Sequence, residues 1–416
     1  MTKVENRKMD SSFEIYMALY QQLTDGQGTD IFKQFSENFF DLIIVDECHR
    51  GSAADDSNWK KILEYYKSAT QIGLTATPKE TNEISNIHYF GEPIYTYSLK
   101  QGIDDGFLAP YKVIRINLDK DLVGYRPEAG KRDVDGNIIE DDDIYYQSDM
   151  DKKIIIDERT QAVAKRVTEF LKNTNRYNKT IVFCIDIEHA ERMRQALIKE
   201  NNDMVAENPN YIMRITGDNQ IGKAQLENFI DVEEKYPTIV TTSKLLTTGA
   251  DCKTCKLIVL DSNINSMTEF KQIIGRGTRI REDYNKTYFT IMDFRNASRL
   301  FSDPDFDGEP VSIKNVNPED DTPDDSDENT NVSGVAEDDE KYTFETPILK
   351  PIETGERKGK LHVNGVDVSI YNEIVSYYDK DGKLVTESLK DFSRKSILNE
   401  YASLDDFLHK WNSTDR

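Results

Sequence analysis

The stretch DLIIVDECH, residues 41–49, constrains the fold most, because an apolar run leads directly into acidic residues. Leu42 to Val45 are apolar without polar alternation, as expected for a strand buried in a parallel sheet. Asp46 and Glu47 follow at once. Ligands of open α/β sheets bind outside the carboxyl ends of the strands, so the pattern predicts two carboxylates facing a binding crevice. The alternative is a pair of acids that only ends a strand.

The surrounding sequence alternates strand-like and helix-like segments. NWKKILEYYKSA (58–69) is amphipathic, and QIGLTATP (71–78) is predicted to be a second strand that Pro78 stops. The alternation restarts at residue 157, with helices expected at 158–173 and 188–200 and strands at 179–184, 211–216, 237–242, 256–261 and 287–294. We therefore predict an α/β fold of parallel sheets with helices on both faces, in which part of one doubly wound domain precedes a complete second one.

Changes in composition predict the domain boundaries. We expect the end of the first domain at 1–110, a connector at 111–156, the second domain at 157–300, an acidic linker at 301–345, and hairpins with the start of a helical region at 346–416. The linker is charged and poor in apolar residues, so it cannot bury enough surface to offset its ordering entropy, and we expect it to be disordered. The Asn364-Gly365 and Asp381-Gly382 turns predict the two hairpins.

The net charge of −23 is concentrated in one place. Residues 303–340 contain fifteen Asp/Glu and one Lys, whereas residues 157–300 contain 22 Lys/Arg and 20 Asp/Glu. The total charge therefore does not argue against a nucleic-acid groove in the second domain. No apolar run approaches the roughly 20 residues of a membrane helix, and no signal peptide begins the chain. Four cysteines in 416 residues suggest a reducing, cytoplasmic setting.

Several short stretches, taken together, resemble the motifs of superfamily 2 helicases and translocases. DECH (46–49) and TATP (75–78) are similar to motifs II and III. TIVFC (180–184), TTGAD (247–251) and QIIGRGTR (272–279) are similar to motifs IV, V and VI. The resemblance implies two RecA-like domains, with ATP and Mg²⁺ bound where the domains meet.

The resemblance also implies roles for individual residues. Asp46 would hold Mg²⁺ through water, Glu47 would act as the catalytic base, and Arg276 and Arg279 would be arginine fingers. A planar guanidinium matches the charge spread over a transferred phosphoryl group, and the glycines beside Arg276 let the backbone come close. The other implied residues are Gly249, Asp251 and Gln272 for the nucleotide, His49, Thr75 and Thr77 for coupling, and Thr216, Thr242 and Ser243 for DNA phosphates.

Longer stretches resemble the motor and endonuclease subunit of type I restriction enzymes. They are YRPEAGKRDVDGNIIEDDD (125–143), IDERTQAVAKRVTEFLK (156–172), YYDKDGKLVTESLKDFSRKSIL (377–398) and EYASLDDFLHKWN (400–412). The family implies ATP hydrolysis, translocation of double-stranded DNA and cleavage at a distance, with methyltransferase and specificity subunits as partners. Two alternatives stay open: another superfamily 2 helicase of the repair type, and a module that binds DNA or subunits without catalysis.

Two further patterns bear on the site. No G-x-x-x-x-G-K-[ST] precedes Asp46, and GDNQIGKA (217–224) lacks the hydroxyl that would hold a metal. We therefore expect the phosphate loop to lie N-terminal to this chain, and little ATPase activity from the chain alone. The resemblance to the type I restriction family implies that the nuclease domain lies N-terminal as well. Cys252-x-x-Cys255 has no obvious second pair of zinc ligands, so exposed thiols are expected there instead.

Overall fold

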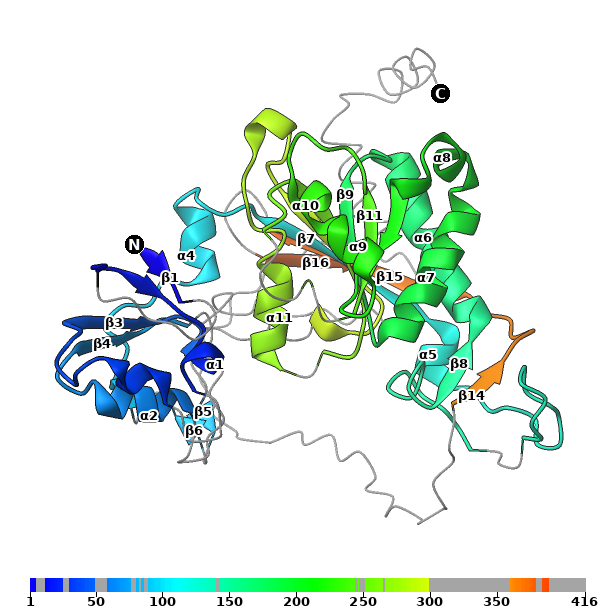
Figure 1. Ribbon diagram of the computed structural model, residues 1–416. Helices are drawn as coiled ribbons and strands as arrows, with labels where there is room; N and C mark the ends of the chain where they lie inside the picture. The colour runs from blue at the N-terminus through cyan, green and yellow to red at the C-terminus, as the bar shows by residue number, and fades with distance from the viewer. Residues whose placement is uncertain are drawn as a thin grey trace, which may run out of the picture. The chain divides into compact units, whose positions relative to one another are not determined.

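The computed structural model divides the chain into two units, each described here by itself (Figure 1). The first consists of Met1–Arg115 and Ala164–Glu309, and the second of Ile116–Val163 and Pro310–Arg416. The domain boundaries drawn from composition stay a prediction. The structure describes residues 1–4, 12–24, 30–48, 58–75, 80–81, 84–85, 89–139, 143–243, 246, 251–264, 266–298, 360–378 and 384–388.

The N-terminal part of the first unit contains two parallel strands, β3 (Leu42–Val45) and β4 (Thr70–Gly73), joined through helix α2 (Asn58–Tyr65). The predicted βαβ order is therefore confirmed. The other elements of this part are β1 (Thr2–Lys3), β2 (Tyr16–Met17), α1 (Tyr20–Leu23), η1 (Ile31–Gln34), β5 (Glu80–Thr81), β6 (Ile84–Ser85) and α4 (Leu99–Asp104).

Strand β3 is less buried than its apolar sequence predicted. Ile43 packs on a cluster that includes Phe32, Ile62 and Tyr66. On the opposite face, Leu42 is 50% exposed and Ile44 57% exposed. The prediction of a fully buried strand is wrong. Successive side chains point to opposite faces, and among the described residues β4 is the only strand paired with β3 and the cluster covers only one face.

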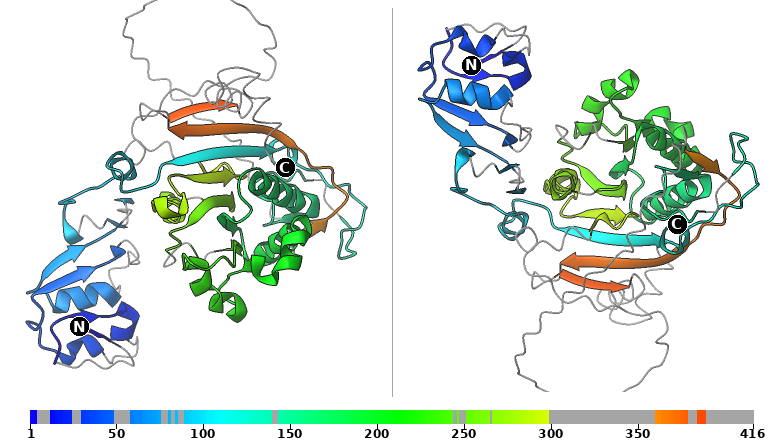
Figure 2. Two further views of the ribbon diagram at one scale, coloured as in Figure 1. Left: turned by 90° about the horizontal axis from the view of Figure 1, so that it is seen from above. Right: turned by 90° about the horizontal axis from the view of Figure 1, so that it is seen from below.

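The second sheet of the first unit contains six neighbouring strands in the order β10-β11-β9-β12-β13-β7, with every pair among them parallel (Figure 2). Its strands are β7 (Tyr111–Leu118), β9 (Lys179–Cys184), β10 (Ile212–Arg214), β11 (Ile239–Thr242), β12 (Cys255–Asp261) and β13 (Phe289–Asp293). The α/β fold class is confirmed, and the pairs among these six strands are parallel as predicted, although the sheet as a whole is mixed. Strand β7 was expected to belong to the connector, but its residues Tyr111–Arg115 pair with β13.

Burial explains why this sheet is easy to recognise in the sequence. Every residue of β9, β11 and β13 is buried, which a non-alternating apolar run predicts. Helix α7 (Ile187–Glu200) begins at Asp186, whose side chain accepts the His189 amide, and buries one stripe of residues that includes Met193 and Leu197. The remaining helices are α6 (Asp157–Asn173), α8 (Asn202–Glu207), η3 (Pro209–Tyr211), α9 (Gln220–Ala224), α10 (Leu226–Ile230), α11 (Met267–Ile274) and η5 (Glu282–Tyr284).

The second unit joins the middle of the chain to its C-terminal part. Strands β8 (Ile154–Ile156) and β14 (Leu361–Val363) pair in parallel and share an apolar core with Ile139, Tyr145 and Met150. A buried Arg159 contacts Asp121 of α5 (Asp119–Val123) at 2.9 Å and Asp151 at 3.7 Å. Tyr145 is packed in this core, whereas its neighbours Ile144 and Tyr146 are exposed.

Of the two predicted hairpins, one forms. Strands β15 (Ile370–Tyr378) and β16 (Leu384–Ser388) pair antiparallel across the Asp381-Gly382 segment. The prediction of a hairpin at Asn364-Gly365 is wrong, because β14 pairs instead with the buried apolar strand β8. The linker expected at 301–345 and the helical pieces expected near 393–411 lie outside the described residues. In the described part of the chain, no helix is long and apolar enough to span a bilayer.

Candidate functional site

The acidic turn after β3 is tied to the end of β4. The amide of Cys48 donates to Leu74 O at 3.0 Å, and the amide of Leu74 donates to Val45 O at 2.8 Å. Asp46 is exposed and accepts the amide of Glu47 at 2.9 Å. The carboxylates therefore lie at the carboxyl edge of two parallel strands, where α/β sheets bind ligands.

Glu47 has an unusual backbone. Its φ of 52° lies in the left-handed region, which non-glycine residues adopt rarely and which clusters at functional sites. Burial raises the pKa of the next residue, Cys48, so its thiol stays protonated. Thr75 follows Leu74 and is partly buried. Two other residues predicted for this site, His49 and Thr77, lie outside the described residues.

The predicted arginines follow helix α11, whose first turn is capped by the Ser266 side chain. Arg276 Nε donates to the carbonyl of Gln272 at 3.2 Å. Arg279 Nε donates to Asp251 Oδ1 at 3.1 Å, and both side chains are about half exposed. The structure thus brings Gln272 to Arg276, and Asp251 to Arg279. Gly249 lies outside the described residues.

Close packing explains the glycine within the arginine segment. A Cβ added at Gly277 would lie 2.3 Å from the Phe289 ring of β13, so any larger residue would have to displace that ring. Thr278 is buried, and its hydroxyl donates to Gly275 O at 3.0 Å. Gly277 is therefore required by packing within the protein, and close approach of this backbone to a phosphate stays a prediction.

The residues predicted to contact DNA phosphates lie at the ends of β10 and β11. Thr216 is buried, and its hydroxyl donates to Asp218 at 2.6 Å, which engages the hydroxyl within the protein. Thr242 is buried at the end of β11, and Ser243 is partly buried. Of these three side chains, Ser243 is the most accessible.

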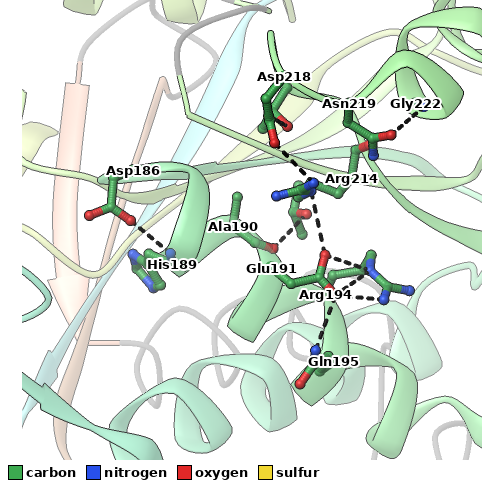
Figure 3. Close-up of polar contacts among 12 residues, drawn as sticks. Asp186, His189, Ala190, Glu191, Arg194, Gln195, Arg214, Asp218, Asn219 and Gly222 are labelled. Atoms are coloured by element: carbon green, nitrogen blue, oxygen red, sulfur yellow. Dashed lines mark hydrogen bonds and ion pairs between the residues drawn. The ribbon is translucent and has the colours of Figure 1, made fainter. Parts of the chain in front are cut away.

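Beside Thr216 lies a group of alternating charges (Figure 3). Arg214 contacts Asp218 at 3.2 Å and Glu191 of α7 at 3.4 Å, and Glu191 also accepts Arg194 at 2.6 Å. Partial burial raises the pKa of Glu191, but hydrogen bonds from Arg194 and Gln195 outweigh this and leave its pKa lowered. The two acids and two arginines balance in charge, so this group contributes little net attraction for phosphate.

A buried polar network at the ends of β12 and β13 was missed in the sequence. Asp261 accepts Arg295 Nε at 2.6 Å and lies 3.4 Å from His189 Nε2, with all three side chains fully buried. Asp293 accepts the amides of Arg295, Ala297 and Ser298 at 2.7–3.1 Å. The available signal was the one used for β3, an apolar run that ends in aspartate.

The cysteine pair differs from its prediction. Cys252 and Cys255 are both fully buried, so the expectation of exposed thiols is wrong. Burial raises the pKa of Cys252, and it raises that of Cys255 to about 12. Among the described residues, no three His, Cys, Asp or Glu side chains lie close enough together to hold a metal ion. These two cysteines are core residues of the second sheet.

Comparison with known proteins gives two family matches. Residues 1–80 match the family described as type III restriction enzyme, res subunit, and residues 162–281 match the helicase conserved C-terminal domain.

Full-length relatives extend these matches. The chain is 54% identical to the type I restriction enzyme EcoAI endonuclease subunit of Escherichia coli, over all of this chain and 53% of that protein. It is 30% identical to the EcoKI endonuclease subunit of E. coli K12, over 61% of this chain and 24% of that one. The chain therefore spans about half of the first relative and about a quarter of the second.

A solved structure is similar as well. A fragment described as an HsdR subunit of a type I restriction enzyme from Vibrio vulnificus is 44% identical, with a TM-score of 0.58. The match covers 74% of this chain and 53% of that one.

Proposed function

Because the chain belongs to the family of type I restriction enzyme endonuclease subunits, we propose that it forms part of an ATP-driven motor on double-stranded DNA. The intact subunit would hydrolyse ATP, translocate DNA and cut it in a type I restriction–modification system. Its partners would be the methyltransferase and specificity subunits. The observation that carries this proposal is the Asp46–Glu47 turn at the shared edge of β3 and β4, in which Asp46 is exposed and Glu47 partly buried.

The carboxylates have distinct parts in the proposed hydrolysis. Asp46 fits a Mg²⁺ site because it is an exposed oxygen ligand, and Mg²⁺ in nucleotide sites is commonly held by one or two carboxylates, water and the phosphates themselves. When bound, the ion neutralises charge on the phosphates of ATP. Glu47 would accept a proton from the attacking water, and its left-handed backbone supports a specialised role for this position.

The arginines would act on the phosphoryl group. Arg276 and Arg279 would contact the γ-phosphate oxygens, where a guanidinium finger is worth about 10³–10⁵ in rate. The ion pair with Asp251 supports this proposal, because it holds the Arg279 side chain while leaving it about half exposed. Gln272 and Gly249 would bind the nucleotide from the same segments.

The DNA contacts would be blind to base sequence. Thr242 ends β11 and Ser243 follows it, and a hydroxyl or an amide there would bind phosphate oxygens. Thr216 would bind phosphate only if its hydrogen bond to Asp218 opened. His49, Thr75 and Thr77 would couple ATP hydrolysis to DNA movement, since Thr75 lies two residues after β4, the strand beside the catalytic turn.

Substituting the base tests the proposal. In the intact subunit assembled with its partners, Glu47→Gln is expected to lower DNA-stimulated ATP hydrolysis by at least about 100-fold while ATP binding persists, because only proton transfer is lost. Glu64→Gln on the exposed face of α2 is the matched control and should hydrolyse ATP normally. A Glu47→Gln enzyme with wild-type turnover would refute the assignment.

A further inference from the structure

The segment between α4 and β7 makes a tight turn. Helix α4 begins with a capping box, in which the Gln101 amide donates to Ser98 Oγ at 3.1 Å and the Gln101 side chain accepts the Ser98 amide at 2.9 Å. At its other end, the amides of Phe107 and Leu108 both donate to Gly102 O, at 2.9 and 2.8 Å. The backbone that leaves α4 is therefore fixed to the helix itself.

The Leu108 side chain folds back onto the same glycine. A Cβ added at Gly102 would lie 2.5 Å from Leu108 Cδ1 and 2.9 Å from its Cγ. Only a residue without a side chain leaves room for this contact. A larger residue at Gly102 would therefore displace the Leu108 side chain.

The next residues run along the arginine loop, Gly275–Arg279. Leu108 forms an antiparallel bridge with Arg279, and the amide of Ala109 donates to Thr278 O at 2.7 Å. Ala109 is fully buried. Pro110 O then accepts the amide of Phe289, and β7 begins. One backbone segment thus borders the loop and continues into the sheet.

The loop also rests on β13, where Gly277 packs against the Phe289 ring. The loop backbone therefore contacts both the Leu108–Ala109 segment and β13. In contrast, the Arg279 side chain is about half exposed. This arrangement fixes the backbone that carries the guanidinium groups while leaving them accessible.

We propose that Leu108 and Ala109 are positioning residues for the arginine loop. This inference rests on the proposed function, since it assumes that Arg276 and Arg279 act on ATP. The segment follows the acidic strands in the chain and ends on the arginine loop, so it sets where the guanidinium groups are held for hydrolysis. A small displacement of such groups can cost about 100-fold in rate.

The test removes the backbone donor at Ala109. In the intact subunit, Ala109→Pro lacks the N–H that binds Thr278 O, so kcat for ATP is expected to fall about 100-fold with KM changed less than about threefold. Phe107→Ala is the matched control, because that side chain is 72% exposed and its backbone contacts remain. DNA binding should stay near wild type in both variants. The melting temperature should fall for Ala109→Pro, which loses the hydrogen bond to Thr278 O, and should stay near wild type for Phe107→Ala.

Two further variants separate the possible outcomes. In an Arg276→Ala, Arg279→Ala background, Ala109→Pro should cause no additional loss, whereas general destabilisation would lower activity further. If Ala109→Pro does not fold, Gly102→Ala replaces it, because the added Cβ displaces Leu108. The kcat and KM for ATP of this variant then test the positioning role. A folded variant with wild-type kcat overturns the inference while leaving the proposed function intact. Normal kcat after loss of both arginines overturns the proposed function and the inference with it.

Discussion

Strands β3, β12 and β13 share one sequence pattern, an apolar run that ends in aspartate, yet their aspartates differ completely. Asp46 after β3 is exposed. Asp261 of β12 is buried with Arg295 and His189, and Asp293 of β13 accepts three backbone amides. Donors built into the fold satisfy the second and third carboxylates. The first is left accessible to a ligand, so the surroundings of a strand-end acid, rather than the pattern, separate structural from functional residues.

The strands themselves differ in the same way. Ile44 of β3 is 57% exposed, while Ile258 of β12 is fully buried. In the described residues, β12 has a paired strand on each side, whereas β3 has β4 alone. Stability of the chain should therefore depend on the second sheet far more than on the first.

The largest effect is expected at the buried ion pair. Asp261→Asn should lower the free energy of unfolding by about 3–5 kcal/mol, because it removes the negative charge that pairs with the buried Arg295. Asp46→Asn, the same chemical change at the exposed strand end, should stay within about 0.5 kcal/mol of wild type. Urea unfolding of the 416-residue chain, followed by circular dichroism, measures both. Equal losses of unfolding free energy would show that Asp261 does not stabilise the fold more than Asp46 does.

An isoleucine pair tests the strands without altering charge. Ile258→Ala should cost about 2–5 kcal/mol, since it removes buried methyl groups and leaves a cavity. Ile44→Ala removes the same atoms from an exposed face and should cost less than about 1 kcal/mol. The same unfolding experiment compares them. A large loss at Ile44 would mean that the exposed face of β3 is covered in solution.

The contrast between the buried second sheet and the exposed β3 also explains which elements could be predicted from the sequence. Strand β9 was placed at the observed residues because a strand buried on both faces has a continuous apolar sequence. The acidic turn and the arginine segment were found as short local patterns. The pairing of β14 with β8, and of β7 with β13, depends on partners distant in the chain, which local turn and composition signals do not specify.

The site was predictable to a similar extent. The residue types at Asp46, Glu47, Arg276 and Arg279 come from the sequence, but the pairing of Arg279 with Asp251 does not. Neither does the burial of Cys252 and Cys255, since the position of a thiol in the core depends on the sheet that surrounds it. The contact of Ala109 with Thr278 joins residues far apart in the chain, and no local motif indicates it.

The smallest expected difference concerns the thiols of the two sheets. Only the thiolate is nucleophilic, so a raised pKa slows alkylation. The pKa of Cys48 is raised by burial beside β3, but that of Cys255 reaches about 12 within the second sheet. With iodoacetamide at pH 8, Cys48 should react at least about tenfold faster than Cys255, as measured by mass spectrometry of the peptides.

The same shift gives a pH dependence of defined sign. A thiol whose pKa is higher in the folded protein stabilises the fold, and this contribution is complete below the unfolded pKa of about 8.5. It is lost as the pH rises toward the folded value of about 12 at Cys255. A Cys255→Ala variant should therefore lose less stability than wild type between about pH 8.5 and 10. Parallel pH profiles, or equal alkylation of all the thiols before unfolding, would contradict the burial that distinguishes the second sheet from the first.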